Sequence, residues 1–70
     1  MEVNVERLRT LRRLRAMSQE ELAEESGVGR ATISRIERGE TGAHGKTLRK
    51  LAKTLGVDVS ELVAVGGGDA

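Results

Sequence analysis

Apolar residues recur three or four positions apart along most of the chain, which is the spacing of one face of a helix. The pattern predicts helices over residues 5–16, from 18 to about 27, and over 30–38, 45–55 and 59–64. Capping residues precede these stretches and glycines follow most of them, as helix starts and stops require. The sequence therefore predicts a compact all-α fold of five helices.

The central stretch, residues 18–39, has the clearest signals for where helices begin and end. Ser18 and Glu21 have the spacing of a capping box, in which the hydroxyl accepts a backbone N–H and the carboxylate reaches back to the cap. Gly27 falls where the chain must leave that helix, and Ile33 and Ile36 lie three apart on one face of the next. These signals predict two short helices joined by a tight turn.

The composition limits the chain to one small domain with an aliphatic core. Its 70 residues include no Phe, Tyr, Trp, Cys or Pro, and the net charge is +1. Without cysteine, a disulfide framework or a thiolate metal site is excluded. No apolar run approaches the ~20 residues that cross a membrane, and the N-terminus lacks the features of a signal peptide. We therefore expect a cytoplasmic protein with no membrane partner.

Nothing in the sequence points to catalysis. His44 is the one histidine, and a single imidazole without cysteine is far from the usual zinc ligand sets. The glutamates of residues 20–25 include two adjacent pairs, but neighbours on a helix point in different directions and nothing suggests a pocket that would shift their pKa values. We expect no enzyme activity, no metal and no cofactor.

The stretch 18–39 and its flanks resemble the helix-turn-helix of the Cro/phage-repressor type, also called the xenobiotic-response-element family. The resemblance covers about residues 5–64 and implies a repressor-like DNA-binding domain over residues 1–65, with helices 2 and 3 as the helix-turn-helix and a recognition helix at about 30–38. The matching residues are Ser18, Gln19, Leu22, Ala23, Gly27, Val28, Ile33, Ser34, Ile36, Glu37 and Gly39, with Leu8, Leu11 and Arg12 before them and Thr47, Leu48, Leu51, Ala52, Leu55, Gly56 and Val57 after them.

The resemblance implies which side chains would meet double-stranded DNA. A recognition helix presents its N-terminal residues to base edges in the major groove, and arginine and alanine suit guanine and the thymine methyl respectively. The expected base-reading residues are Arg30, Ala31, Ser34 and Arg35. The residues expected at DNA phosphates are Gln19, Thr32, Arg38, His44 and Lys46. The alternative is that the arginines form an ordinary solvated face and that Gln19 is a plain first-turn residue.

The resemblance also implies an ion pair and a dimer. Arg12 is expected to pair with Glu37 and to tie the first helix to the end of the recognition helix. A homodimer would bind a near-palindromic site with half-sites about 34 Å apart, through a contact that includes Val59, Leu62 and Val63. The expected function is a sequence-specific transcriptional regulator, most readily a repressor, with no small-molecule effector.

A second interpretation keeps the fold and changes the partner. The acidic residues of 20–25 could bind another protein, as in an antitoxin or adaptor module, because fold does not fix function. The glycine-rich end of the chain, residues 66–70, has nothing to bury and is expected to be a disordered tail.

Overall fold

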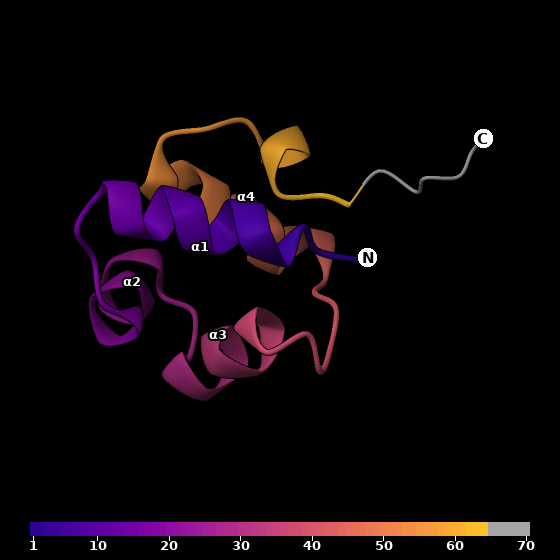
Figure 1. Ribbon diagram of the computed structural model, residues 1–70, viewed down its shortest axis with the longest axis horizontal. Coiled ribbons are helices and arrows are strands. Elements are labelled where there is room, and N and C mark those ends of the chain that lie inside the picture. Colours follow the sequence, from indigo (N-terminus) through magenta and orange to yellow (C-terminus); the bar gives the residue numbers. More distant parts are fainter. Residues whose placement is uncertain (65–70) are drawn as a thin grey trace.

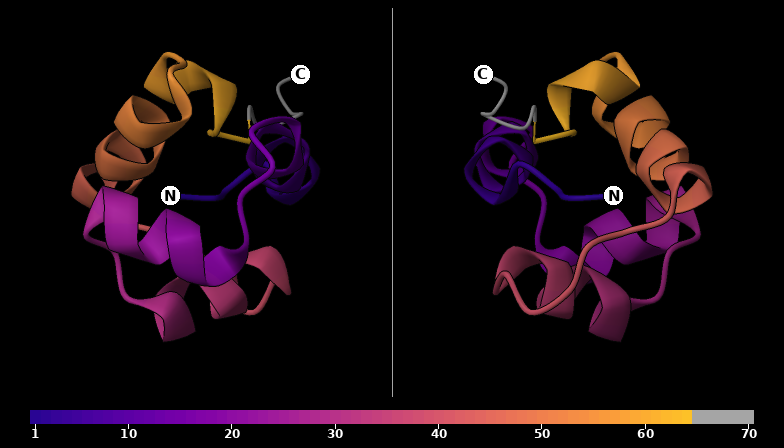
Figure 2. Two further views of the ribbon diagram at one scale, coloured as in Figure 1. Left: turned by 90° about the vertical axis from the view of Figure 1, so that its left-hand side faces the viewer. Right: turned by 90° about the vertical axis from the view of Figure 1, so that its right-hand side faces the viewer.

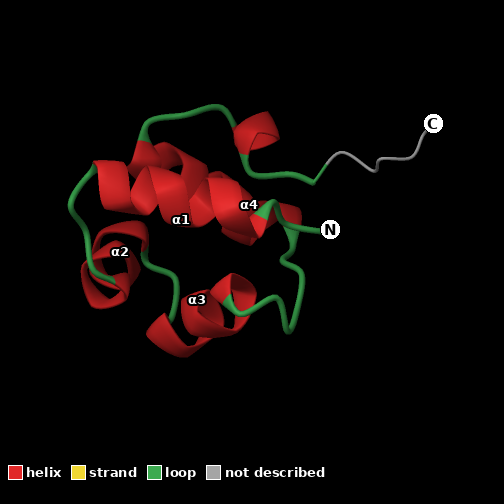
Figure 3. Cartoon of the chain, in the orientation of Figure 1, coloured by secondary structure: helices red, strands yellow, loops and turns green. Residues whose placement is uncertain are grey.

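The computed structural model describes residues 1–64 and contains four α-helices and one 3₁₀ turn (Figure 3). The predicted all-α class is confirmed, whereas the predicted count of five helices is not. The predicted tail, residues 66–70, lies outside the described residues. The elements are α1 (Val5–Leu14), α2 (Gln19–Ser26), α3 (Arg30–Glu37), α4 (Gly45–Leu55) and η1 (Val59–Glu61).

The helix predicted over residues 59–64 is a single 3₁₀ turn, η1. The side chain of Asp58 accepts a hydrogen bond from the Ser60 backbone N–H at the start of this turn. Beyond it, Val63 forms an antiparallel bridge with Val3. The chain therefore leaves the helical path because its backbone pairs with the N-terminal residues.

The helices surround one aliphatic core. Figure 2 shows α1 and α4 on opposite sides of the molecule, with α2 and α3 at one end. Helix α2 packs on α3 and α4, α3 also contacts α1, and η1 rests on α4. The fully buried large side chains are Leu8, Leu22, Ile33, Ile36, Leu48, Leu51, Leu55 and Leu62. Ile33 and Ile36 anchor one face of α3 in this core, so the opposite face of the helix is exposed to solvent.

The prediction that the first helix continues to Ala16 is wrong. Helix α1 ends at Leu14, and Ala16 has φ 53°. The Ala16 N–H donates to Arg13 O at 2.8 Å and the Met17 N–H donates to Arg12 O at 3.1 Å, which is the hydrogen-bond pattern of a Schellman motif. Glycine takes the left-handed position after the other three α-helices, so Ala16 carries a steric cost of about 1 kcal/mol that the others avoid.

Arginines in α1 and directly after it contact the ends of other elements. Arg15 Nε donates to Leu55 O at 2.8 Å, at the C-terminus of α4. Arg9 Nη2 donates to Glu37 O, at the C-terminus of α3. Cations at these two ends meet unpaired carbonyl groups and the negative end of each helix dipole. A third arginine, Arg7, pairs with Glu61 on the surface.

Replacing Ala16 by glycine should raise the free energy of unfolding by about 1 kcal/mol, because glycine tolerates the left-handed backbone. The matched control is Ala23→Gly in α2, which should lower the same quantity by about 1 kcal/mol, as glycine does within helices. Urea unfolding followed by circular dichroism measures both. A destabilised Ala16→Gly variant would contradict this account of the end of α1.

Candidate nucleic-acid interface

The exposed face of α3 carries most of the predicted base-reading residues. Arg30, Ala31 and Arg35 are exposed, whereas Ser34 is half-buried. Ile33 and Ile36, on the other side of the helix, have no exposed surface. The helix therefore presents two guanidinium groups and one methyl group while its apolar side stays fixed in the core.

The end of α3 is tied to α1 through a buried carboxylate. Arg12 Nε lies 2.7 Å from Glu37 Oε2, and Arg12 Nη2 lies 2.9 Å from Glu37 Oε1. Only 3% of the Glu37 side chain and 12% of the Arg12 side chain are exposed. Arg12 Nη1 also donates to Met17 O at 2.8 Å. This two-pronged contact fixes the orientation of α3 relative to α1.

The pKa of Glu37 reflects two opposing influences. Burial alone would raise it, but hydrogen bonds from Arg12 and Gln19, together with the charges of Arg12 and Arg9, outweigh burial and leave the pKa below its ordinary value. The pKa of Arg12 is raised, chiefly by the hydrogen bond to Glu37 and against the effect of burial. Both groups are thus charged in the folded protein at neutral pH.

Gln19 joins the same carboxylate from the start of α2. Its Nε2 donates to Glu37 Oε1 at 3.0 Å. Because an ionised carboxylate only accepts hydrogen bonds, this contact fixes which end of the amide faces Glu37. The sequence suggested a phosphate contact for Gln19 but gave no sign of this bond. In the structure, Gln19 connects the first helix of the helix-turn-helix to the end of the second.

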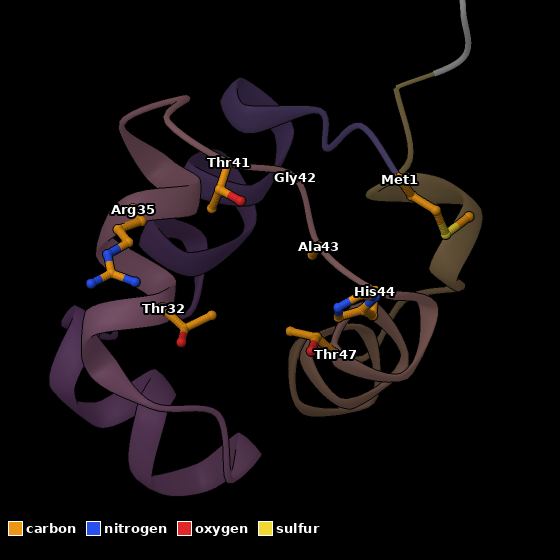
Figure 4. Close-up of a pocket in the computed structure, with 8 residues that line it drawn as sticks. All are labelled: Met1, Thr32, Arg35, Thr41, Gly42, Ala43, His44 and Thr47. Carbon is orange, nitrogen blue, oxygen red and sulfur yellow. The ribbon is translucent and has the colours of Figure 1, made fainter.

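A shallow hollow of about 400 Å³ lies between α3 and the start of α4 (Figure 4). Thr32 and Arg35 border it from α3, and His44 and Thr47 border it from the other side. It is also lined by Met1, Thr41, Gly42 and Ala43. Two predicted phosphate contacts, Thr32 and His44, and the predicted base reader Arg35 therefore lie around one concave surface.

The remaining predicted phosphate contacts lie at the two ends of the segment that joins α3 to α4. Lys46 is exposed in the first turn of α4. Arg38 is exposed and its Nε lies 2.8 Å from Glu40 Oε2. This ion pair was not predicted, although the two charges stand two residues apart in the sequence. Since both partners are more than half exposed, the pair can open at little cost when a phosphate competes for the guanidinium.

The residues predicted for a dimer contact divide into two groups. Val59 and Val63 are half-buried and keep part of their surface free. Leu62 has no exposed surface and belongs to the core. Its predicted role as a contact residue is therefore wrong, because the side chain packs within its own chain.

Residues 1–64 contain no group of three or more His, Asp or Glu side chains placed to hold a metal ion. No helix in this described part of the chain is long and apolar enough to span a membrane.

The fold and the exposed helix define a helix-turn-helix protein: α2 and α3 are joined by a tight turn, and α3 faces outward. Comparison with known proteins supports the same class of protein. A helix-turn-helix family model (HTH_3) matches residues 8–62. The chain belongs to this family, whose relatives are transcriptional regulators and repressors.

Two similar proteins illustrate the match. The uncharacterized HTH-type transcriptional regulator RghRB of Bacillus subtilis (strain 168) is 43% identical over 63 residues, which is 89% of this chain and 45% of RghRB. The cryptic phage CTXphi transcriptional repressor RstR of Vibrio cholerae is 41% identical over 83% of this chain and 52% of RstR. The chain thus spans about half the length of these two relatives.

Among solved structures, the restriction-modification controller protein C.AhdI from Aeromonas hydrophila has a TM-score of 0.77 and 37% identity. The match covers 81% of this chain and 86% of that one. The described helices are therefore arranged as in a protein of nearly the same size.

Replacing Glu37 by glutamine should make the free energy of unfolding less dependent on pH in the acidic range. The pKa of Glu37 is lowered in the folded state, so its carboxylate stabilises the protein above the unfolded pKa of about 4.3, and this contribution is lost as pH falls through the folded pKa. At pH 7 the substitution should cost about 2–3 kcal/mol. Urea unfolding between pH 7 and pH 3 should show the difference from wild type shrinking below about pH 4.

Glu61→Gln is the matched control. It alters an ion pair whose partners are each more than 40% exposed, so it should cost less than about 1 kcal/mol at pH 7. Equal losses for the two variants, or a Glu37→Gln difference that does not change with pH, would refute a structural role for the buried carboxylate.

Proposed function

We propose that this chain is a sequence-specific, double-stranded DNA-binding transcriptional regulator that reads the major groove with α3. The observation that carries the proposal is the combination of an exposed Arg30, Ala31 and Arg35 with a helix locked from behind. Arginine donates two hydrogen bonds to guanine O6 and N7, and the methyl group of alanine suits thymine. A rigid helix places these donors in one orientation, as direct readout requires.

Contacts to the DNA backbone would set the register of α3 in the groove. Thr32 and His44 on the hollow, together with the exposed Lys46, are suitable donors for phosphate oxygens. Arg38 joins them when its pair with Glu40 opens. Gln19 can contribute through its second amide N–H or its backbone N–H at the start of α2, where an anion is favoured. Such contacts make binding salt-dependent without selecting a sequence.

The regulator would act as a homodimer on a near-palindromic site. Val59 and Val63 give the C-terminal part a partly exposed apolar surface, and two-fold dimers match inverted half-sites about one helical turn apart. Repression is the favoured outcome, in line with the repressor name of RstR. Two linked half-sites would give the affinity that one small reading helix lacks.

Replacing Arg35 by alanine should weaken binding to the selected duplex about 5- to 150-fold, which corresponds to the loss of one bidentate base contact. The preference for guanine at the position that Arg35 reads should relax as well. Fluorescence anisotropy with the selected duplex, at one stated salt concentration, measures both effects.

The control is Arg13→Ala, which removes the same charge from an exposed position on α1. It should bind with nearly the wild-type affinity and keep the sequence preference. If both variants lose affinity equally and neither changes the preference, the arginines act only through net charge and base reading by Arg35 is refuted.

Replacing Val59 by aspartate should shift the protein from dimer to monomer while leaving it folded, because a charge would be placed in the apolar contact. Ser60→Asp, next to it and exposed, is the control and should remain dimeric. Analytical ultracentrifugation of both variants, with circular dichroism to check folding, decides the matter. A folded, dimeric Val59→Asp protein would exclude this surface.

A further inference from the structure

The first four residues form a short extended segment, here called the strap, between two other parts of the chain. On one side, the Asn4 N–H donates to Leu62 O at 2.8 Å and the Ala64 N–H donates to Glu2 O at 3.0 Å. On the other side, the Ala43 N–H donates to Met1 O at 2.9 Å. The strap thus joins residues 62–64, which follow η1, to residues 38–44, the connecting loop between α3 and α4. Figure 1 shows the N-terminus beside this loop.

The strap approaches the connecting loop most closely at Gly42. A Cβ atom at this position would clash with the backbone carbonyl oxygen of Met1 and lie 3.1 Å from the Met1 carbonyl carbon. Gly42 is not among the residues with positive φ. Glycine is therefore required here for space and not for backbone conformation, and any larger residue must push the strap and the loop apart.

The first part of the connecting loop is held by backbone hydrogen bonds to α3, the last of them from Glu40 N–H to Arg35 O, whereas residues 41–43 have, within the described part of the chain, one backbone hydrogen bond, from Ala43 to Met1, and the packing of Ala43 on the core. The loop contains two glycines and no proline, and His44 caps α4 without a side-chain hydrogen bond. Yet the loop carries one wall of the hollow opposite Thr32 and Arg35, and Met1 lies on that wall (Figure 4). The bond from Ala43 to Met1 therefore helps to set the distance between the loop and the recognition helix.

We propose that the strap is a positioning element for DNA binding, in which the Met1 carbonyl holds the connecting loop where His44 and Lys46 reach the DNA backbone while α3 lies in the groove. The proposal rests on the proposed function. A loop ordered before binding loses less conformational freedom on the DNA, so its contacts contribute more fully to affinity. The strap touches no base and leaves the sequence preference of α3 unchanged.

The test compares Gly42→Ala with Gly45→Ala. The first adds a methyl group against the Met1 carbonyl, whereas the second adds the same group three residues later, where the nearest atoms are Arg49 Nη1 at 3.4 Å and the Met1 sulfur at 3.7 Å. Gly42→Ala should bind the selected duplex about tenfold more weakly near 0.15 M salt. The slope of log affinity against log salt concentration should be smaller in magnitude by about one to two, as expected for one or two lost phosphate contacts. Gly45→Ala should match wild type.

Two further measurements separate positioning from general destabilisation. Hydrogen exchange at the Ala43 amide should speed up at least about tenfold in Gly42→Ala, because the bond to Met1 is lost, while core amides stay protected. The half-site selected from a random duplex library should not change. A variant lacking residues 1 and 2 removes the two acceptors, Met1 O and Glu2 O, without adding bulk, and it should behave like Gly42→Ala. It provides the deciding result if Gly42→Ala does not fold.

The outcomes distinguish this proposal from the proposed function. Suppose that the wild-type protein binds duplex, and that Gly42→Ala shows faster hydrogen exchange at Ala43 but the same salt slope as wild type. The strap then does not position the phosphate contacts, and the proposal is overturned. The same holds if the half-site preference changes along with the slope. If wild type selects no duplex, the proposed function fails and the strap's role in it fails too, although the exchange result would still establish its hold on the loop.

Discussion

The buried carboxylate of Glu37 constrains how α1, α2 and α3 are arranged. An ionised carboxylate is expensive to bury unless its oxygens are satisfied, and here Arg12 supplies two donors from α1 and Gln19 one from the start of α2. All the donors are present only when α1, α2 and α3 lie in one relative orientation. The contact therefore selects a geometry more than it adds stability, and that geometry is what a base-reading helix needs.

The arginines in and directly after α1 show that clustered charges in a sequence need not form a binding surface. Five arginines crowd residues 7–15 of the sequence, yet three of them, Arg9, Arg12 and Arg15, donate to Glu37 and to the ends of α3 and α4. The cations nearest the proposed base-reading surface instead come from α3 and the residues that follow it. A chain with a net charge of only +1 can thus still present a local cationic surface, and specificity depends on where the free guanidinium groups lie.

Local signals predicted much of the fold. The capping box at Ser18, the stop at Gly27 and the spacing of Ile33 and Ile36 lead directly to α2, the turn and α3, since each acts over a few residues. Apart from the Arg12–Glu37 ion pair, which the family resemblance implied and the structure contains, contacts between distant segments were not predicted. The pairing of Val3 with Val63 replaced an expected helix by an extended segment, and the same packing buried Leu62, because local periodicity does not show which apolar residues become core.

The most direct test of the account is selection from a random duplex library with the purified wild-type protein at near-physiological salt. An exposed α3 held in one orientation, in the proposed two-fold dimer, predicts an enriched inverted repeat that contains guanines, with half-site centres about one helical turn apart. A folded protein that enriches no sequence would contradict the claim that α3 reads DNA and would favour a protein partner for the same scaffold.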